Sequence, residues 1–309
     1  MSEIHYTLRQ LQYFVAVAET GTMSGAAALC HVSQPGLSLA ISQLERSLGV
    51  KLLVRNRAKG ATLTPAGDRL LTDAKALLSQ AEGLQEQADL EGGGLTGRLA
   101  VGCYATLAPL LIPALLTGFE QVCPGVTLEF TENPQPELQQ ALREGAIEVA
   151  FLYDHQLGAD LDHVVVDRVV PYVLLPADHR FAGDDEVQLE SLSSEPMILF
   201  DVPPSRQNWQ RMVSAVGVEP LVGHTTQNFE LARSLVGRGL GYALLLQRPP
   251  IEWTYEGRRV VAKPIAEQMP TIDIVLAHAV GTQLTARARR FTEFTIATLS
   301  ARAELDPTG

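Results

Sequence analysis

A regular stripe of leucines and alanines along residues 65–91 limits how this chain can fold. The spacing alternates between four and three residues, which is the repeat of a helix that packs against a second helix: Leu70, Ala74, Leu77, Ala81, Leu84 and Ala88. About 26 helical residues at ~1.5 Å each form a rod of roughly 39 Å. Because the 64 residues before it are too few to cover such a rod, the stripe favours pairing with a second copy of this chain over packing within it.

Threonine, proline and glycine mark the ends of this rod. Thr64-Pro65 supplies a cap and a first-turn proline, and Gly92-Gly93-Gly94 is the clearest domain boundary in the chain. At roughly 100–200 residues per domain, 309 residues make two or three domains. We therefore expect a first domain over 1–64, a linker helix over 65–91 and a larger domain over 92–309.

Positive charge is concentrated in the first domain. Residues 1–64 carry six Lys or Arg against three acids, a net charge of +3, whereas the remainder carries 18 against 32, a net charge of −14. Five of the six basic residues lie between Arg46 and Lys59, with no acid among them. This asymmetry indicates a nucleic-acid-binding segment joined to an acidic body; a solvated basic loop is the alternative.

Other protein classes fit this sequence poorly. Three cysteines, Cys30, Cys103 and Cys123, are too few for a disulfide scaffold, so a reducing cytosol is the simplest setting. The N-terminus lacks the basic and apolar regions of a secretion signal. Residues 99–119 carry no charge and are long enough to span a bilayer, but two glycines and two prolines interrupt them. We expect a buried strand and a helix there, and no membrane segment.

Three helices are expected in the first domain, over Leu8–Glu19, Met23–Leu29 and about Gln34–Leu48. Small alanines in the second helix allow another helix to cross closely over it. Ser33 is placed to cap the third helix. One side of that helix is apolar and is formed by Leu37, Ile41, Leu44 and Leu48.

The opposite side of the third helix carries short side chains, which suits entry into a DNA major groove. Gln34 can address a base edge and Leu39 a thymine methyl, while the serines nearby can reach a base or a phosphate. A plain solvated face is the alternative. The candidate DNA-binding residues of this helix are Ser33, Gln34, Pro35, Ser38, Leu39, Ser42 and Arg46.

A basic hairpin is expected directly after the third helix. Lys51–Arg55 and Ala61–Leu63 flank a turn that ends in glycine. Arg55, Arg57 and Lys59 would project from this hairpin as a wing. Their expected targets are phosphates or the minor groove, contacts that position a protein on DNA more than they select a sequence.

These segments together resemble a LysR-type transcriptional regulator. The resemblance is carried by an ordered series of motifs: Leu8-Arg-Gln-Leu-Gln-Tyr-Phe14, Ala26-Ala-Ala28, Ser33-Gln-Pro-Gly-Leu-Ser38, Ile41-Ser-Gln-Leu-Glu45, Leu48-Gly-Val50, Arg55 and Leu63-Thr-Pro-Ala-Gly67. It continues more loosely over 97–102, 145–150 and 235–241 and so covers nearly the whole chain. The chain departs from the pattern at Leu39, Ala40 and Ser42, where members often carry Arg or another polar residue.

The resemblance implies an α+β multidomain architecture, with an N-terminal winged helix-turn-helix, a long linker helix and a C-terminal two-lobed α/β effector domain similar to type 2 periplasmic binding proteins. Lobe I would cover about 95–162 and 271–302, and lobe II about 163–270. Alternating segments after Leu95 predict βα units around parallel sheets. The expected strands are Leu99–Cys103, Val126–Thr131, Val149–Tyr153 and Thr271–Ala277, the expected helices are Ala105–Val122 and Glu137–Glu144, and Val164–Leu175 would cross into lobe II.

Ligands of open α/β sheets bind beyond the carboxyl ends of the strands. Residues at such places form the candidate effector-binding set: Tyr104, Thr106, Tyr153, Phe200, Asp201, Arg206, Gln227, Asn228 and Phe229. The resemblance also points to a hydroxyl at Thr106, where this hydroxyl and nearby N–H groups can hold an anion. An anionic, carboxylate-bearing small molecule is therefore the expected effector. Capping, turn and packing roles are the alternative for each residue.

No enzymatic or metal site is expected. The seven histidines include no pair at metal-ligand spacing, and no nucleophile has a base and an orienting group beside it. We expect neither catalysis, nor a metal, nor a cofactor. Peroxide-sensing LysR-type proteins keep a cysteine pair in lobe II, whereas residues 163–270 contain no cysteine, so thiol sensing is not expected.

The sequence thus predicts a cytoplasmic transcriptional regulator that binds double-stranded DNA and a small-molecule effector. It would form a homodimer through residues 65–91, and dimers of similar proteins commonly pair into tetramers. Effector binding would shift an equilibrium between arrangements of lobes and subunits. The alternative is a solute-binding protein that shares the sensor architecture without a DNA role, which is disfavoured because residues 1–64 would then lack a function.

Overall fold

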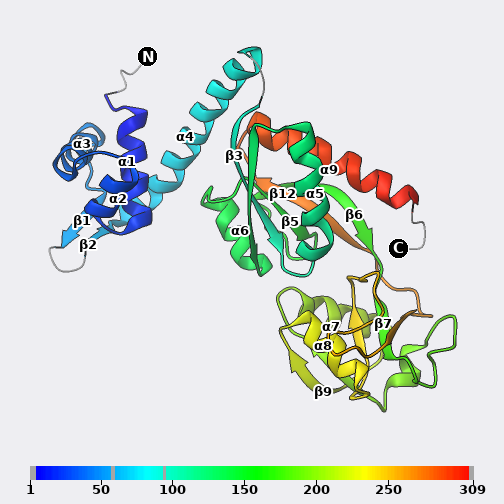
Figure 1. The fold of residues 1–309 in the computed structure, drawn as a ribbon. Coiled ribbons are helices and arrows are strands. Elements are labelled where there is room, and N and C mark those ends of the chain that lie inside the picture. The colour runs from blue at the N-terminus through cyan, green and yellow to red at the C-terminus, as the bar shows by residue number, and fades with distance from the viewer. Residues whose placement is uncertain (1–4, 57–59, 93–94, 306–309) are drawn as a thin grey trace. The chain divides into compact units, whose positions relative to one another are not determined.

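The computed structural model describes residues 5–56, 60–92 and 95–305 (Figure 1). Contacts within the chain divide it into two compact units. The first unit comprises the residues up to Thr96 with the short segments Arg143–Ala146 and Gly281–Arg287. The second unit comprises the remainder and contains two lobes, each built on its own sheet.

The first unit consists of helices and one hairpin, as expected, with the two strands shifted by one or two residues. Its elements are α1 (Leu8–Thr20), α2 (Met23–Leu29), α3 (Gln34–Leu48), β1 (Leu53–Asn56), β2 (Gly60–Leu63) and α4 (Pro65–Gly92). Side-chain oxygens of Thr7, Thr22 and Ser33 accept hydrogen bonds from the first turns of α1, α2 and α3. Gly21 and Gly49 end α1 and α3 in the left-handed conformation. Such caps fix helix bounds locally.

One apolar core joins α1, α2 and α3. Phe14, Ala26 and the apolar side of α3 are buried in it. The small side chain of Ala26 has no exposed surface and contributes to this packing, in agreement with the expected close helix crossing. Burial of one side of α3 leaves its opposite side at the surface.

The apolar stripe of α4 divides into a covered part and an exposed part. Ala74 of the stripe is buried, and Leu70 packs against the core of α1 to α3, as does Leu78 beside the stripe. Leu77 and Leu84 of the stripe are 41% and 69% exposed. Packing within the chain, the alternative left open by the sequence, therefore accounts for the first turns of the stripe only.

Lobe I is built on a mixed five-stranded sheet with the order β4-β3-β5-β12-β6. Its parallel strands are β3 (Gly97–Tyr104), β4 (Val126–Asn133) and β5 (Val149–Tyr153), and β12 (Ile272–Ala279) is antiparallel to β5 and to β6 (Leu161–Val169). The helices are α5 (Ala108–Val122), α6 (Gln135–Arg143) and α9 (Ala286–Leu305). Rings of Phe119 in α5 and Phe291 in α9 meet with centroids 5.2 Å apart, so these two helices lie side by side (Figure 1).

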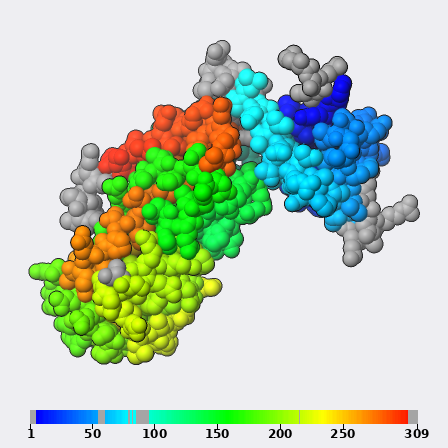
Figure 2. Space-filling model, turned by 180° about the vertical axis from the view of Figure 1, so that it is seen from behind, coloured from blue at the N-terminus to red at the C-terminus, as the bar shows by residue number. Residues whose placement is uncertain are grey.

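Lobe II, coloured from green to orange in Figure 2, repeats this plan. Its elements are β7 (Tyr172–Pro176), the short 3₁₀ helix η1 (Leu189–Leu192), β8 (Pro196–Phe200), α7 (Ser205–Ala215), β9 (Leu221–Thr226), α8 (Phe229–Gly237), β10 (Ala243–Leu245) and β11 (Val260–Pro264). Strands β8 and β9 are parallel, and a parallel bridge between Met197 and Tyr242 joins the β8 and β10 segments. Because β7 is antiparallel to both β10 and β11, the order β9-β8-β10-β7-β11 matches lobe I strand for strand.

The expectation of parallel sheets is wrong for one part of each lobe. Strands β12 and β7 run against their neighbours, with Ile274 opposite Tyr153 at the carboxyl end of β5 and Tyr172 opposite Leu245 at the carboxyl end of β10. Each of these two strands enters its lobe from the other lobe. A strand that starts at the carboxyl ends of its neighbours must run antiparallel to them.

A close approach between α4 and the chain before β1 generates a first prediction. A methyl group on Gly67 would lie 2.1 Å from the carbonyl oxygen of Leu52. We expect Gly67→Ala to lower the free energy of unfolding by about 1–3 kcal/mol, because the clash is with backbone.

The matched control is Gly83→Ala in the same helix, where an added methyl meets nothing within 4 Å. That variant should be neutral or more stable by about 0.5–1 kcal/mol. Thermal unfolding followed by circular dichroism measures both. Equal effects of the two substitutions would contradict the close approach.

Candidate functional site

The exposed side of α3 contains the residues expected to contact DNA. Gln34, Pro35, Leu39 and Arg46 are exposed, with Leu39 57% exposed. Ser33 is exposed as well and caps the helix through its hydroxyl, which accepts a hydrogen bond from the N–H of Gly36. The structure therefore places these side chains on one accessible surface.

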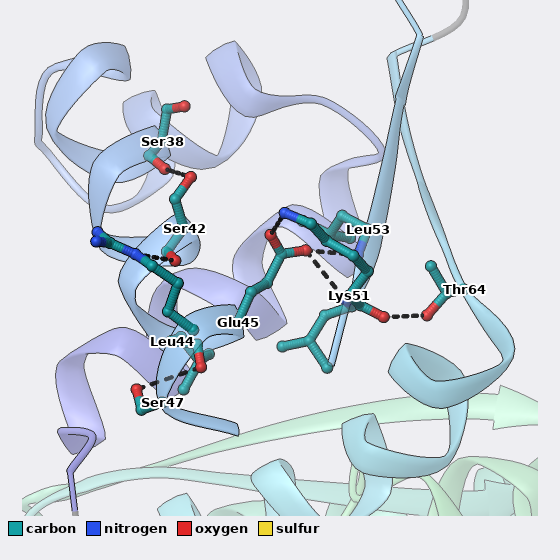
Figure 3. A network of polar contacts seen from close by, with 10 residues as sticks. Ser38, Ser42, Leu44, Glu45, Ser47, Lys51, Leu53 and Thr64 are labelled. Carbon is teal, nitrogen blue, oxygen red and sulfur yellow. Dashed lines mark hydrogen bonds and ion pairs between the residues drawn. The ribbon is translucent and has the colours of Figure 1, made fainter. Parts of the chain in front are cut away.

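The two serines of this surface are half-buried and partly engaged by the helix itself (Figure 3). The Ser42 hydroxyl donates to the Ser38 carbonyl at 2.9 Å, and Arg46 Nε donates to the Ser42 carbonyl at 3.2 Å. Through the bond to Ser38, the Ser42 side chain is engaged within its own helix. The bond to Ser42 holds Arg46 along the surface of the helix.

The buried carboxylate of Glu45 links α3 to the start of the hairpin. The sequence pattern did not identify Glu45 as a functional residue. Glu45 is 4% exposed and accepts hydrogen bonds from the N–H groups of Leu52 and Leu53 at 2.9 and 3.2 Å, and from Lys51 Nζ at 2.8 Å. Burial raises the pKa of Glu45, but these hydrogen bonds outweigh it, so the pKa lies below its ordinary value. The motif Ile41-Ser-Gln-Leu-Glu45 carried the signal, because its acid falls on the buried side of α3.

Thr64 links the segment before β1 to the first turn of α4. Its hydroxyl donates to the Lys51 carbonyl at 2.6 Å (Figure 3). The same hydroxyl accepts from the N–H of Gly67 at 2.9 Å. The expected cap at the start of α4 is confirmed. Arg55 lies in β1 opposite Ala61, whereas Arg57 and Lys59, the other two residues of the predicted wing, lie outside the described residues.

The Glu45 network predicts how the first unit depends on pH. Hydrogen bonds to a charged group contribute about 1.5–3 kcal/mol each, so Glu45→Gln should lower the free energy of unfolding by at least about 1.5 kcal/mol at neutral pH. Since the pKa is lower in the folded chain than in the unfolded chain, this contribution is complete above the unfolded value of about 4.3 and is lost as the pH falls through the folded value.

Denaturant unfolding of both proteins between pH 7 and pH 3 measures this effect. The difference in stability between wild type and the Glu45→Gln variant should shrink as the pH falls. A difference that stays constant over this range would show that the carboxylate charge is not what stabilises the hairpin.

A small pocket that is open to solvent lies within the second unit between residues of both lobes. It is lined by Thr106, Tyr153, Ile198, Leu199, Phe200, Ser205, Asn208, Trp209, Met212, Phe229, Leu244, Leu245, Leu246 and Gln247. These residues come from the carboxyl-terminal parts of β5, β8 and β10, from the segment after β3, from α7 and from the first turn of α8. This is the place where ligands bind in open α/β sheets.

Hydrogen bonds at the pocket join the two lobes. Tyr104 OH donates to the Val202 carbonyl at 3.3 Å and lies 3.0 Å from Ser205 Oγ. Gln247 Nε2 donates to Tyr153 OH at 3.1 Å. Burial raises the pKa of Tyr153 to about 12, although hydrogen bonds from neighbouring side chains oppose the rise. The phenol is therefore neutral at physiological pH and can both donate and accept.

The structure brings about half of the predicted effector set together. Thr106, Tyr153, Phe200 and Phe229 line the pocket, and Tyr104 adjoins it through Ser205. As expected, Tyr104, Tyr153 and Phe200 end strands, Phe229 begins a helix and Thr106 lies in the turn between β3 and α5. Their contact with an effector remains a prediction.

The other four predicted residues are not among the lining residues. Asp201 and Arg206 form an ion pair, and the hydrogen bond from Arg206 lowers the pKa of Asp201. Asn228 caps α8 by accepting from the N–H of Leu231 at 2.8 Å, and Gln227 is exposed. In the structure, Asp201 and Arg206 therefore form an ion pair, and Asn228 acts as a helix cap.

Several lining residues were missed at the sequence level. Ser205, Asn208, Trp209 and Met212 are spaced by three, one and three residues, which places them on one side of α7. This periodicity could have identified them. Gln247 follows the buried strand β10, so the rule that selected Tyr153 applies to it as well.

The sequence predicted neither a metal site nor a membrane-spanning segment. Among residues 5–56, 60–92 and 95–305, no group of three His, Cys, Asp or Glu side chains could hold a metal ion. No helix in the same ranges is long and apolar enough to cross a membrane. The uncharged stretch 99–119 instead forms most of β3 and α5, as expected.

Comparison with known proteins defines the class. Residues 8–68 match the family described as bacterial regulatory helix-turn-helix protein, lysR family, and residues 92–300 match the LysR substrate binding domain. A DNA-binding head joined to an effector-binding domain defines a transcriptional regulator. The chain belongs to the LysR family of transcriptional regulators, and the alternative of a solute-binding protein without a DNA role does not hold.

Individual relatives are similar to this chain over most of its length. The HTH-type transcriptional regulator TfdS of Cupriavidus pinatubonensis is 33% identical over 77% of this chain and 81% of that protein. A LysR family regulator from Pseudomonas aeruginosa, PA01 protein, is 37% identical, with a TM-score of 0.65 over 96% of this chain and 99% of that one. A variant of full-length OxyR from Pseudomonas aeruginosa is 26% identical, with a TM-score of 0.76 over 96% of this chain and 98% of that one.

Proposed function

We propose that the exposed side of α3 reads the DNA major groove and that the hairpin holds the phosphate backbone. The observation that carries this proposal is the exposure of Leu39 and its polar neighbours opposite a buried side of the same helix. The proposed DNA-binding residues are Ser33, Gln34, Pro35, Ser38, Leu39, Ser42 and Arg46 in α3 and its cap, with Arg55, Arg57 and Lys59 in or near the hairpin. Residues 1–64 would form the DNA-binding domain, 65–91 the linker and 92–309 the effector domain.

A gel-shift experiment with the chain's own upstream DNA tests this proposal. Leu39→Ala should lower the affinity for the specific site roughly tenfold, about 1.4 kcal/mol, through the lost apolar contact, while affinity for unrelated DNA stays unchanged. Leu29→Ala is the matched control, because Leu29 is 58% exposed on α2, outside the proposed surface. Equal losses in the two variants, or no specific shift at moderate salt, would contradict the proposal.

The wing has a different signature in the same experiment. Arg55→Ala should weaken binding to specific and unrelated DNA alike, because a phosphate contact carries no sequence information. The dependence of affinity on salt should become shallower by about one ion. A loss confined to the specific sequence would instead assign Arg55 to base recognition.

The linker helix is proposed to pair two copies of the chain. Leu77 and Leu84 are seven residues apart on the stripe and exposed, as a helix seam requires. Leu77→Glu together with Leu84→Glu should convert the oligomer to monomers in analytical ultracentrifugation, whereas Thr72→Glu, exposed on the outer side of α4, should not. The mass of the wild type decides between a dimer and a tetramer, and a wild-type monomer would contradict the pairing.

The pocket is proposed to bind a small-molecule effector that controls DNA binding. Because both lobes contribute hydrogen-bonding groups to it, a bound molecule favours one arrangement of the lobes over another. We propose that the protein acts in the cytoplasm, where its DNA lies, and that it catalyses no reaction.

A further inference from the structure

The pocket surface is uncharged. None of its lining residues, all of which the structure describes, is Asp, Glu, Lys, Arg or His. Arg206, the single cation in the predicted effector set, is paired with Asp201 and does not line the pocket. The first turns of α5 and α7 lack side-chain caps and offer only the partial positive charge of a helix end. An anion buried without a full countercharge is costly, so the pocket favours a neutral molecule over a carboxylate.

Asn208 is the most unusual polar group of the pocket. Its side chain is 1% exposed, and neither Oδ1 nor Nδ2 has a hydrogen-bond partner. It lies on the side of α7 that faces the pocket, together with Trp209 and Met212. Buried amides in proteins are nearly always hydrogen-bonded. An amide that is unpaired beside a pocket offers one acceptor and two donors to a ligand.

The remaining polar groups supply a second recognition point. Tyr153 accepts from Gln247 at 3.1 Å and lies 3.4 Å from Thr106 Oγ1. The hydroxyls of Tyr153 and Thr106 each carry one proton. The hydrogen bond between them uses one of these two protons. The other proton remains available for an acceptor in the pocket. Apolar side chains, among them Phe200 and Phe229, line the same pocket.

We propose that the pocket binds an uncharged molecule with an apolar body and a carboxamide or lactam group, whose N–H and C=O pair with Oδ1 and Nδ2 of Asn208. The inference rests on the proposed function, since it names the chemical class of the effector for the same pocket. Asn208 then determines specificity, because a molecule without the matching donor and acceptor would leave the buried amide unpaired.

Tryptophan fluorescence of the full chain tests the proposal. The sequence has two tryptophans, and Trp253 is 56% exposed, so a Trp253→Phe background leaves Trp209 as the reporter inside the pocket. The probes are benzamide, benzoate and toluene, which share a ring and differ in the group attached to it. Benzamide should bind with a dissociation constant on the order of 1 mM. Benzoate and toluene should bind about tenfold more weakly, since each lacks the paired donor and acceptor.

Asn208→Leu should abolish the preference for benzamide over toluene without lowering the melting temperature, because it replaces a buried unpaired amide by an apolar group of similar size. Gln207→Leu is the matched control, since the buried Gln207 Oε1 is also unpaired but the residue does not line the pocket. That variant should keep the preference for benzamide.

Three results would overturn the proposal: tighter binding of benzoate than of benzamide, a preference for benzamide that survives Asn208→Leu, or no response of Trp209 to any probe. The first result would support the anionic effector expected from the sequence. Specific DNA binding measured on the same variants keeps the two proposals apart. Intact DNA binding with a failed probe series rejects only the neutral effector, whereas loss of specific DNA binding in the wild type rejects the proposed function.

Discussion

The burial of one side of α3 is the constraint on which the DNA-binding head depends. Leu37, Ile41 and Leu44 have no exposed surface, so the residues on the opposite side must face outward. The exposure of Leu39 is thus a consequence of packing elsewhere on the same helix. Glu45 extends this constraint to the hairpin, because it accepts three hydrogen bonds from the segment that begins the wing. The third helix and the hairpin are therefore held together, which fits the function of a LysR family regulator.

The strand directions in the two lobes follow from the path of the chain between them. Both lobes have the same strand order, and in both the strand that arrives from the other lobe is antiparallel. The carboxyl ends of the parallel strands consequently gather around one pocket, as do α7 and the first turn of α8. Hydrogen bonds such as that from Gln247 to Tyr153 cross between the lobes at this place. A molecule bound there contacts both lobes, which is the physical requirement for a ligand that changes their arrangement.

The first 64 residues and the pocket of the second unit differ in charge. The first 64 residues have a net positive charge, concentrated near the hairpin, and DNA carries a dense negative charge that such a region attracts. The pocket lining has no charged side chain, although the remainder of the chain is strongly acidic. Its specificity then depends on hydrogen-bond geometry and shape, and the unpaired amide of Asn208 is the clearest element of that geometry.

Local sequence signals determined the helices of the head, because caps such as Ser33 and left-handed glycines such as Gly49 act over a few residues. They also determined which side of α3 faces outward and that Thr106 and Tyr153 follow strands. Only the tertiary structure decided that Asn208 lies beside them and that Ala74 is buried against α1 to α3. The physical reason is distance along the chain: these neighbours come from elements whose pairing depends on how the chain passes between lobes and helices, and a local pattern carries no record of that path.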